Sequence, residues 1–115
     1  LNTNPLFVSR YPQNQNKDFI KWMMSIPNNY VHFGDFDIAG IGIYLNEYKK
    51  HLQRKSSFFI PENIKSDLRD NGNRERFDNQ KMNFDIDKIQ ESKVLELIKL
   101  IEKEKKGLDQ EYYIR

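Results

Sequence analysis

The 115-residue chain is predicted to fold as one α/β domain of three layers, with a short central parallel sheet and helices on both faces. Three observations lead to this fold class. Apolar runs typical of strands alternate three times with amphipathic segments typical of helices, the order that builds a parallel sheet. The strand-like runs are continuously apolar, as buried parallel strands are. The length provides for one hydrophobic core, so we expect a single domain over residues 1–115.

The first half of the chain predicts two strand–helix pairs. The apolar run at residues 6–9 is expected to be a buried strand, and residues 16–26 a helix with apolar side chains at i, i+4 spacing. Residues 30–33 are expected to form the second, central strand and residues 38–52 the second helix. Gly40 in the first turn of that helix costs helix propensity, which indicates a close approach of its backbone to the sheet or to a ligand.

The second half predicts a third strand and a less regular region after it. Residues 57–60 are expected to be the strand, and Pro61 is suited to the first position of a helix that runs to residue 70. The segment 73–90 is polar, with one short helix expected around residues 74–79.

The clearest helical pattern lies near the end of the chain, over residues 91–106. Its apolar side chains share one face, and the lysines at its end complement the negative end of the helix dipole. Gly107 follows directly and is expected to be the C′ residue that ends the helix.

Composition excludes several classes of protein. The chain has 19 Lys and Arg against 17 Asp and Glu, a balance that gives no argument for nucleic-acid binding from charge alone. It has no cysteine, which excludes disulfides and cysteine-based zinc sites and fits a reducing compartment. We expect a cytoplasmic protein with no membrane partner, since no apolar stretch approaches the length of a membrane span. The chain opens without Met on a strand-like run, and we interpret it as a domain excised from a longer protein.

The strongest chemical signal is the pair Asp35 and Asp37, one residue apart between the second strand and the second helix. This place is the carboxyl end of a strand, where open α/β sheets bind their ligands. Two adjacent carboxylates repel unless a cation lies between them, which predicts a site for Mg²⁺ or Mn²⁺. The other interpretation makes Asp37 an ordinary N-cap of the helix and Asp35 a polar residue at a strand end.

Three segments carry a further pattern: Ser9-Arg10-Tyr11-Pro12 after the first predicted strand, Asp35-Phe36-Asp37-Ile38-Ala39-Gly40 after the second, and Gly107-Leu108-Asp109-Gln110-Glu111 near the end. Together they resemble the Toprim domain, in the version found in the A subunit of topoisomerase VI and in Wadjet-type plasmid-defence nuclease subunits. In that family one strand ends in Gly-aromatic-Pro, the next ends in Asp-x-Asp-x-x-Gly, and a Leu-Glu-Gln-Glu run closes the Wadjet-type domains. The chain departs from the pattern at Arg10 and Ile38, where the family has Gly and Pro.

The resemblance implies a Toprim-like (Rossmannoid) fold and a metal-dependent activity on DNA. Asp35 and Asp37 would be the catalytic carboxylates and bind Mg²⁺, with Glu111 as a third metal ligand, in phosphodiester cleavage or strand passage. The family's upstream glutamate has no counterpart, because Asp18 in a predicted helix is the one acidic residue before Asp35. We therefore expect that glutamate before Leu1, and the isolated fragment to be inactive. The implied partners are DNA, other domains of the same chain, and a homodimer partner or the subunits of an SMC-like complex.

The basic residues Lys49, Lys50, Arg54 and Lys55 gather at the end of the second helix. They are the candidate DNA-binding residues, and a solvated face is the ordinary interpretation of such a run. The chain has two histidines. His32, within the second predicted strand, is expected to be a core or surface residue and not a ligand, and His51, four residues after Glu47, is expected to form an ordinary i, i+4 helix pair.

Two other functions remain open at this point. A non-catalytic Toprim relic would serve as a protein- or DNA-interaction module, and its mark would be loss of the upstream glutamate. A haloacid-dehalogenase-like phosphatase would use Asp35 as a nucleophile. Ala39, where such phosphatases have Thr or Val, and the short chain both count against it.

Overall fold

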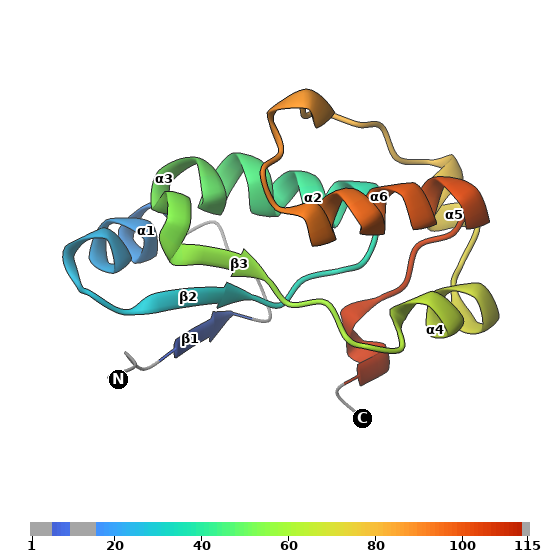
Figure 1. Ribbon diagram of the computed structural model, residues 1–115, viewed down its shortest axis with the longest axis horizontal. Coiled ribbons are helices and arrows are strands. Elements are labelled where there is room, and N and C mark those ends of the chain that lie inside the picture. Colours follow the sequence, from blue (N-terminus) through green and yellow to red (C-terminus); the bar gives the residue numbers. More distant parts are fainter. Residues whose placement is uncertain (1–5, 10–15, 114–115) are drawn as a thin grey trace.

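The protein is an α/β domain built on a three-stranded parallel sheet, and the computed structural model describes residues 6–9 and 16–113 (Figure 1). The strands β1 (Leu6–Ser9), β2 (Asn29–His32) and β3 (Ser56–Phe58) lie in the order β1-β2-β3, all parallel. Val31 at the centre of β2 is paired with Val8 on one side and Ser57 on the other. The predicted central strand and its two parallel neighbours are confirmed. Residues 10–12 of the Toprim-like pattern lie outside the described residues.

The predicted helices of the first half are confirmed, with one local change. Helix α1 (Asn16–Ser25) connects β1 to β2. The stretch from Ile38 to Lys55, before β3, is helical throughout, and its middle winds as a π-helix, a rare form often found near functional sites. It consists of α2 (Ile38–Ile43), the π-helix η1 (Tyr44–Lys49), α3 (Lys50–Leu52) and the 3₁₀ turn η2 (Gln53–Lys55).

The second half differs from the prediction mainly at the boundaries of its elements. Strand β3 ends at Phe58, and the next helix begins at Ile64 and not at Pro61. Pro61 instead starts a turn, in which its carbonyl oxygen accepts a hydrogen bond from the Ile64 N–H at 3.2 Å. The remaining elements are α4 (Ile64–Asn71), α5 (Glu75–Asp78), the 3₁₀ turn η3 (Ile86–Lys88), α6 (Ser92–Glu104) and the 3₁₀ turn η4 (Gln110–Tyr113).

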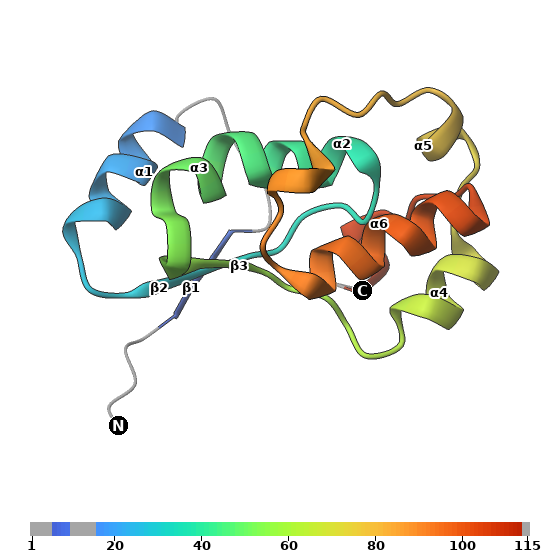
Figure 2. The ribbon, with the colours of Figure 1, turned by 45° about the horizontal axis from the view of Figure 1, so that its top comes forward.

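The expectation of helices on both faces of the sheet is wrong for the described residues. Helices α1, α2 and α3 lie on the same side of the strands in Figures 1 and 2, and α4 and α6 pack together toward the carboxyl ends of the strands. On the other face Val31 and Phe33 are half-buried, and Phe59 is exposed. The strand order explains the difference. Strands added in one direction by right-handed crossovers place every connecting helix on one face, and a second helical layer needs a reversal of that order.

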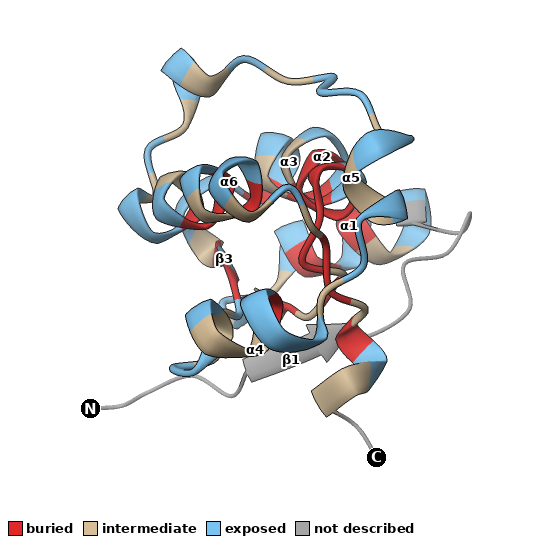
Figure 3. Ribbon diagram, turned by 90° about the vertical axis from the view of Figure 1, so that its right-hand side faces the viewer, coloured by how far each residue is buried: buried red, intermediate tan, exposed pale blue. Residues whose placement is uncertain are grey.

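The helix-facing side of the sheet carries an aromatic core. Figure 3 colours the buried residues, which include parts of α2, β3 and α6. Tyr30 and His32 point to this side, and Tyr30 stacks on Tyr48 of η1 with ring centroids 5.1 Å apart. The Tyr30 hydroxyl shares a 2.7 Å hydrogen bond with Nδ1 of His32. Burial lowers the pKa of His32 to about 4, so the ring is neutral at physiological pH. His32 is thus a core residue, one of the two structural roles expected for it.

Two short backbone pairings bring distant segments to the carboxyl edge of the sheet. Phe36, between the two aspartates, pairs antiparallel with Leu108 through hydrogen bonds of 2.8 and 3.0 Å. Asn73, before α5, pairs with Gly107 through bonds of 2.7 and 3.0 Å. The segment after β2, the start of α5 and the chain after α6 therefore meet at one place. None of the helices in the described part of the chain combines the length and apolar character needed to cross a membrane.

Candidate functional site

Asp37 both caps α2 and faces the carboxyl edge of the sheet. Its backbone is extended (φ −148°, ψ 173°), and its Oδ1 accepts a 2.6 Å hydrogen bond from the Gly40 N–H. The N-cap interpretation of Asp37 is thus confirmed for one of its two oxygens. Its second oxygen, Oδ2, accepts hydrogen bonds from Arg76 and from Gln80 Nε2, the latter at 3.1 Å. The cap and the site are therefore parts of one carboxylate.

Arg76 on α5 joins three carboxylates. Its Nη1 lies 3.3 Å from Oδ2 of Asp35 and 2.9 Å from Oδ2 of Asp37. Its Nη2 lies 2.7 Å from Oδ2 of Asp109, in the segment after α6. We call this set, Asp35, Asp37, Asp109 and Arg76, the carboxylate centre.

The two oxygens of each carboxylate have different partners. The Oδ1 atoms of Asp35 and Asp109 accept 2.9 Å hydrogen bonds from the backbone N–H groups of Gln110 and Glu111, as Oδ1 of Asp37 does from Gly40. The Oδ2 atoms of all three face the single guanidinium. Each Oδ1 atom thus binds a backbone N–H, and the three Oδ2 atoms converge on the guanidinium of Arg76.

Two glycines permit this close packing. A Cβ on Gly40 would lie 2.3 Å from the carbonyl oxygen of Asp35, so its backbone closely approaches the segment after β2, whereas the predicted approach was to the sheet or to a ligand. A Cβ on Gly107 would lie 2.6 Å from Cβ of Asp37 and 2.8 Å from Cβ of Arg76. Gly107 was expected to end α6 in the left-handed conformation. Lys105 takes that role, with φ 56° and ψ 44°. Gly107, which has no side chain, instead allows Arg76 of α5 and Asp37 to pack closely around it.

The carboxylate centre carries excess negative charge. Its three carboxylates bring three negative charges and Arg76 one positive charge, which leaves about −2. Burial raises the pKa of Asp35, and the charges of Asp37 and Asp109 raise it further, against the opposing effects of the Gln110 N–H and Arg76. Burial alone would lower the pKa of Arg76, but its hydrogen bond to Asp37 and the nearby carboxylates raise it. The net negative charge of the centre therefore favours binding of a further cation there.

The residue types of the centre suit a hard cation, but the guanidinium lies in its place. Carboxylate oxygens are the ligands that Mg²⁺ and Mn²⁺ prefer. Within residues 6–9 and 16–113, no three His, Cys, Asp or Glu side chains are arranged to hold a metal ion. A metal at the three Oδ2 atoms would require Arg76 to withdraw.

The predicted third ligand, Glu111, lies beside this centre on an exposed position of η4. The carboxylate that the structure brings to Arg76 is Asp109, two residues earlier. Asp109 holds the first acidic position of the run that is similar to Leu-Glu-Gln-Glu, and this likeness is the signal that could have found it. Arg76 and Gln80 had no such signal, because they lie in the polar segment 73–90 without a recognisable pattern.

The predicted DNA-binding residues lie at the other end of the helical stretch. From Asp37 to Lys49 is twelve residues, roughly 18 Å along a helix. The ammonium of Lys49 donates to the carbonyl of Ser56 at 2.9 Å, and that of Lys55 donates to carbonyl oxygens near the end of α1. Lys50 and Arg54 are exposed. The structure therefore does not bring this basic stretch to the carboxylates.

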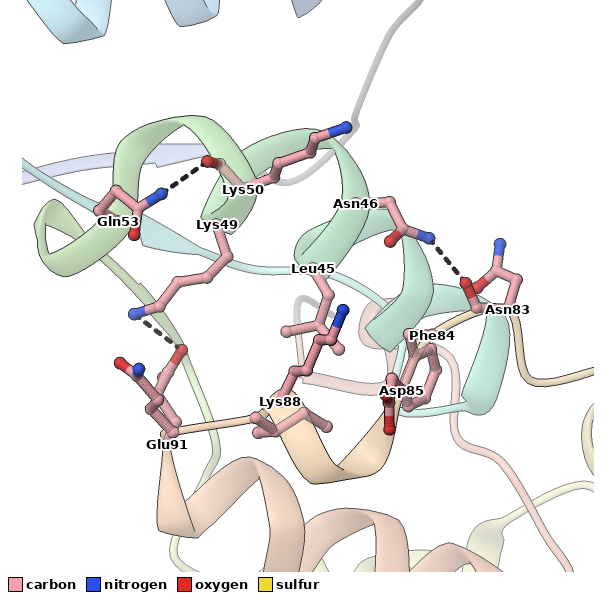
Figure 4. A pocket seen from close by; sticks show the side chains of 12 residues that line it. Leu45, Asn46, Lys49, Lys50, Gln53, Asn83, Phe84, Asp85, Lys88 and Glu91 are labelled. Carbon is pink, nitrogen blue, oxygen red and sulfur yellow. Dashed lines mark hydrogen bonds and ion pairs between the residues drawn. The ribbon is translucent and has the colours of Figure 1, made fainter.

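A hollow of about 600 Å³ opens between η1 and the segment 83–91 (Figure 4). Lys49, Lys50 and Lys88 contribute positive charge to its lining, and Asp85 and Glu91 contribute negative charge. Lys49 points toward Glu91, and their charged atoms lie 3.3 Å apart. Because these charges nearly balance, the lining of the hollow gives no argument that it binds phosphates.

The comparisons with known proteins give a family and no function. No curated protein and no solved structure matches the chain. The family described as "Domain of unknown function (DUF7281)" matches residues 2–115, nearly the whole length. The chain therefore belongs to the DUF7281 family.

Proposed function

We propose that this protein is a Toprim-like domain that binds Mg²⁺ or Mn²⁺ at Asp35, Asp37 and Asp109 and belongs to a longer protein that cleaves DNA or passes its strands. The support from the sequence is the Asp-x-Asp-x-x-Gly motif that ends at Gly40. The support from the fold is its place, at the carboxyl end of the central strand of a parallel sheet.

The observation that carries the proposal is the convergence of three Oδ2 atoms on one cation. Asp35 and Asp37 are neighbours in sequence, but Asp109 comes from the other end of the chain and still faces the same point. The side chains of Asp35 and Asp109 are partly exposed, at 34% and 42%, so the centre is open to a ligand from solvent. Excess negative charge that is open to solvent favours binding of a divalent cation.

Each residue of the centre has a defined part in this proposal. A bound metal ion would neutralise the charge that develops on a phosphate during phosphodiester cleavage. Asp37 would hold the ion through Oδ2 while its Oδ1 stays on the Gly40 N–H. Gln80 orients Asp37 and is itself held by the Ala39 N–H, which donates to its Oε1 at 2.9 Å. Glu111 could provide a further carboxylate from the adjacent turn.

The proposal extends to the partners of the domain. The glutamate of the Toprim pattern has no counterpart before Asp35 and would come from another domain or chain. The exposed Lys50 and Arg54 would contact DNA phosphates away from the centre. A homodimer partner or the subunits of an SMC-like complex would position the DNA.

A second candidate function is a non-catalytic interaction module, and the contacts of Arg76 favour it. The guanidinium already neutralises part of the negative charge, and every oxygen of the three carboxylates accepts a hydrogen bond. Such a network can exist for stability alone. The phosphatase alternative has no similar support, because Ala39 stands where such phosphatases have Thr or Val.

Metal titration decides between these functions. We expect Mn²⁺ to broaden the amide NMR signals of residues 34–40 and 107–111 at millimolar concentration, since paramagnetic ions broaden nearby nuclei. Asp35→Asn should weaken this response, and Asp78→Asn, an exposed position on α5, should not. Uniform broadening over the surface, unchanged in Asp35→Asn, would refute the metal centre and favour the interaction module. A plasmid-nicking assay on the full-length protein, with the same two variants, tests the activity on DNA.

A further inference from the structure

We infer that Arg76 is a built-in competitor of the divalent cation, so that a metal ion binds the carboxylate centre only when the guanidinium leaves it. The inference rests on the proposed function and concerns the regulation of that site. Its basis is that Arg76 and a metal would use the same three atoms, the Oδ2 oxygens of Asp35, Asp37 and Asp109.

The two cations compete for the same oxygens. The guanidinium spans the three carboxylates, with Nη1 on Asp35 and Asp37 and Nη2 on Asp109. Metal–oxygen distances of about 2.0–2.1 Å for Mg²⁺ are much shorter than these ion pairs, so the metal would draw the oxygens onto itself. The Oδ1 atoms are poorer substitutes, because each already accepts a backbone N–H that fixes its direction.

Arg76 can leave without unfolding the site. Its side chain is 31% exposed, and its neighbours on α5, Glu75 and Asp78, are exposed, so solvent lies next to the guanidinium. The backbone of α5 is held separately, by the pairing of Asn73 with Gly107 and by the contacts of Gln80 with Asp37 and Ala39. A rotation of the side chain alone would therefore open the centre.

The competition has two expected consequences. Without metal, Arg76 keeps the three carboxylates together and stabilises the fold. With metal, the energy of its ion pairs opposes binding, so the wild-type chain should bind weakly. Removal of the guanidinium should then improve metal affinity, the reverse of what the loss of a merely structural residue would do.

The test is a calorimetric titration of the 115-residue chain with Mn²⁺, together with the variants Arg76→Gln, Arg76→Lys and the matched control Arg74→Gln. Arg74 carries the same charge two residues earlier on an exposed position. We expect Arg76→Gln to bind Mn²⁺ about tenfold more tightly than wild type, equal to about 1.4 kcal/mol. Arg76→Lys should fall between them, because an ammonium lacks the planar fork that reaches all three carboxylates. Arg74→Gln should remain within about twofold of wild type, because an exposed charge is screened.

The outcomes separate the two proposals. Equal Mn²⁺ affinity in wild type and Arg76→Gln, with NMR broadening at residues 34–40, would overturn the competition and leave the metal centre intact. No binding at these residues in any variant would overturn both. Should Arg76→Gln fail to fold, the Nε–H NMR signal of Arg76 in the wild-type chain gives the answer under titration with diamagnetic Mg²⁺. A shift of this signal in step with the amides of residues 34–40 supports displacement, and an unchanged signal refutes it.

Discussion

Two networks of charged side chains hold this domain together, and they differ in their charge balance. The first is the carboxylate centre, with three carboxylates for one guanidinium. The second surrounds Glu91, before α6, and we call it the Glu91 latch. Its Oε1 accepts from the Tyr44 hydroxyl and lies 3.3 Å from Lys49 Nζ, and its Oε2 accepts from the Phe58 N–H at 3.3 Å.

The difference in net charge shows which network carries more charge than folding requires. The Glu91 latch connects α6 to η1 and β3 with one carboxylate and one ammonium, so its charges cancel. The carboxylate centre also connects three distant segments, but it retains about two excess negative charges. Stability alone would favour a balanced network there too, since unpaired like charges repel. The excess charge therefore favours a role in binding.

The largest expected effect is a loss of folding stability at acid pH. It sets the pH range in which variants of the two networks can be compared. Burial lowers the pKa of His32 from 6.5 to about 4, so between these values the unfolded chain binds a proton that the folded chain excludes. Stability should therefore be full above about pH 6.5 and fall as the pH drops toward 4, by about 3 kcal/mol in all.

Urea melts from pH 7.5 to 4.5 measure this loss. The variant His51→Gln, at the exposed histidine of α3, should keep the full slope. The variant His32→Gln should flatten the slope, whatever its stability at neutral pH. A His32→Gln chain with the wild-type slope would mean that carboxylates cause the pH dependence.

The next effect shows whether attraction to Arg76 or repulsion between carboxylates dominates the stability of the carboxylate centre. Asp37→Asn keeps an oxygen for the Gly40 cap but loses the negative charge that faces Arg76. Because the Asp37 side chain is 2% exposed, the loss should destabilise the metal-free domain by about 2 kcal/mol at pH 7. Thermal melts of this variant and of Asp78→Asn, the exposed control, check the value. A stabilised Asp37→Asn domain would mean that the carboxylates repel each other without relief from Arg76.

A smaller effect is expected at the Glu91 latch. Glu91→Gln keeps an acceptor for the Tyr44 hydroxyl and the Phe58 N–H but loses the ion pair with Lys49. We expect a loss of about 1 kcal/mol, since both side chains are largely buried. Melts with and without Mn²⁺ should give the same loss, because the latch has no proposed part in metal binding. A loss that metal restores would show that the two networks are coupled.

The smallest effect has the opposite sign. The pKa of Asp35 is raised in the folded protein, chiefly by burial, so the folded state binds a proton more readily than the unfolded state. The stability from that proton is present at acid pH and is lost as the pH rises through the raised pKa, and the ionised carboxylate then costs stability.

Asp35→Asn should therefore stabilise the metal-free domain at pH 7, by no more than about 0.5 kcal/mol, because the side chain is one third exposed. The gain should vanish in melts below about pH 4, where the wild-type carboxyl is also neutral. A clear loss of stability at pH 7 would make Asp35 a structural residue, like Glu91.

The sequence determined the features that depend on neighbours along the chain. The succession of strands and helices along the chain follows from apolar periodicity, which local backbone geometry imposes. The place of Asp35 and Asp37 at the carboxyl edge follows as well, because a strand followed by a helix puts its connecting residues there. The cap at Asp37 is equally local, since it joins residues three apart.

Tertiary structure alone decided the features that join distant residues. Arg76 meets Asp35 and Asp109 across 41 and 33 residues, through a short helix in a segment without periodicity, so no local pattern could predict the contact. Gly107 was predicted from its place after a helix, yet the contact between α5 and Asp37 explains it. The single helical layer arose from the direction in which strands were added, which apolar patterns do not record. Such contacts depend on how whole elements pack, and only the folded chain shows them.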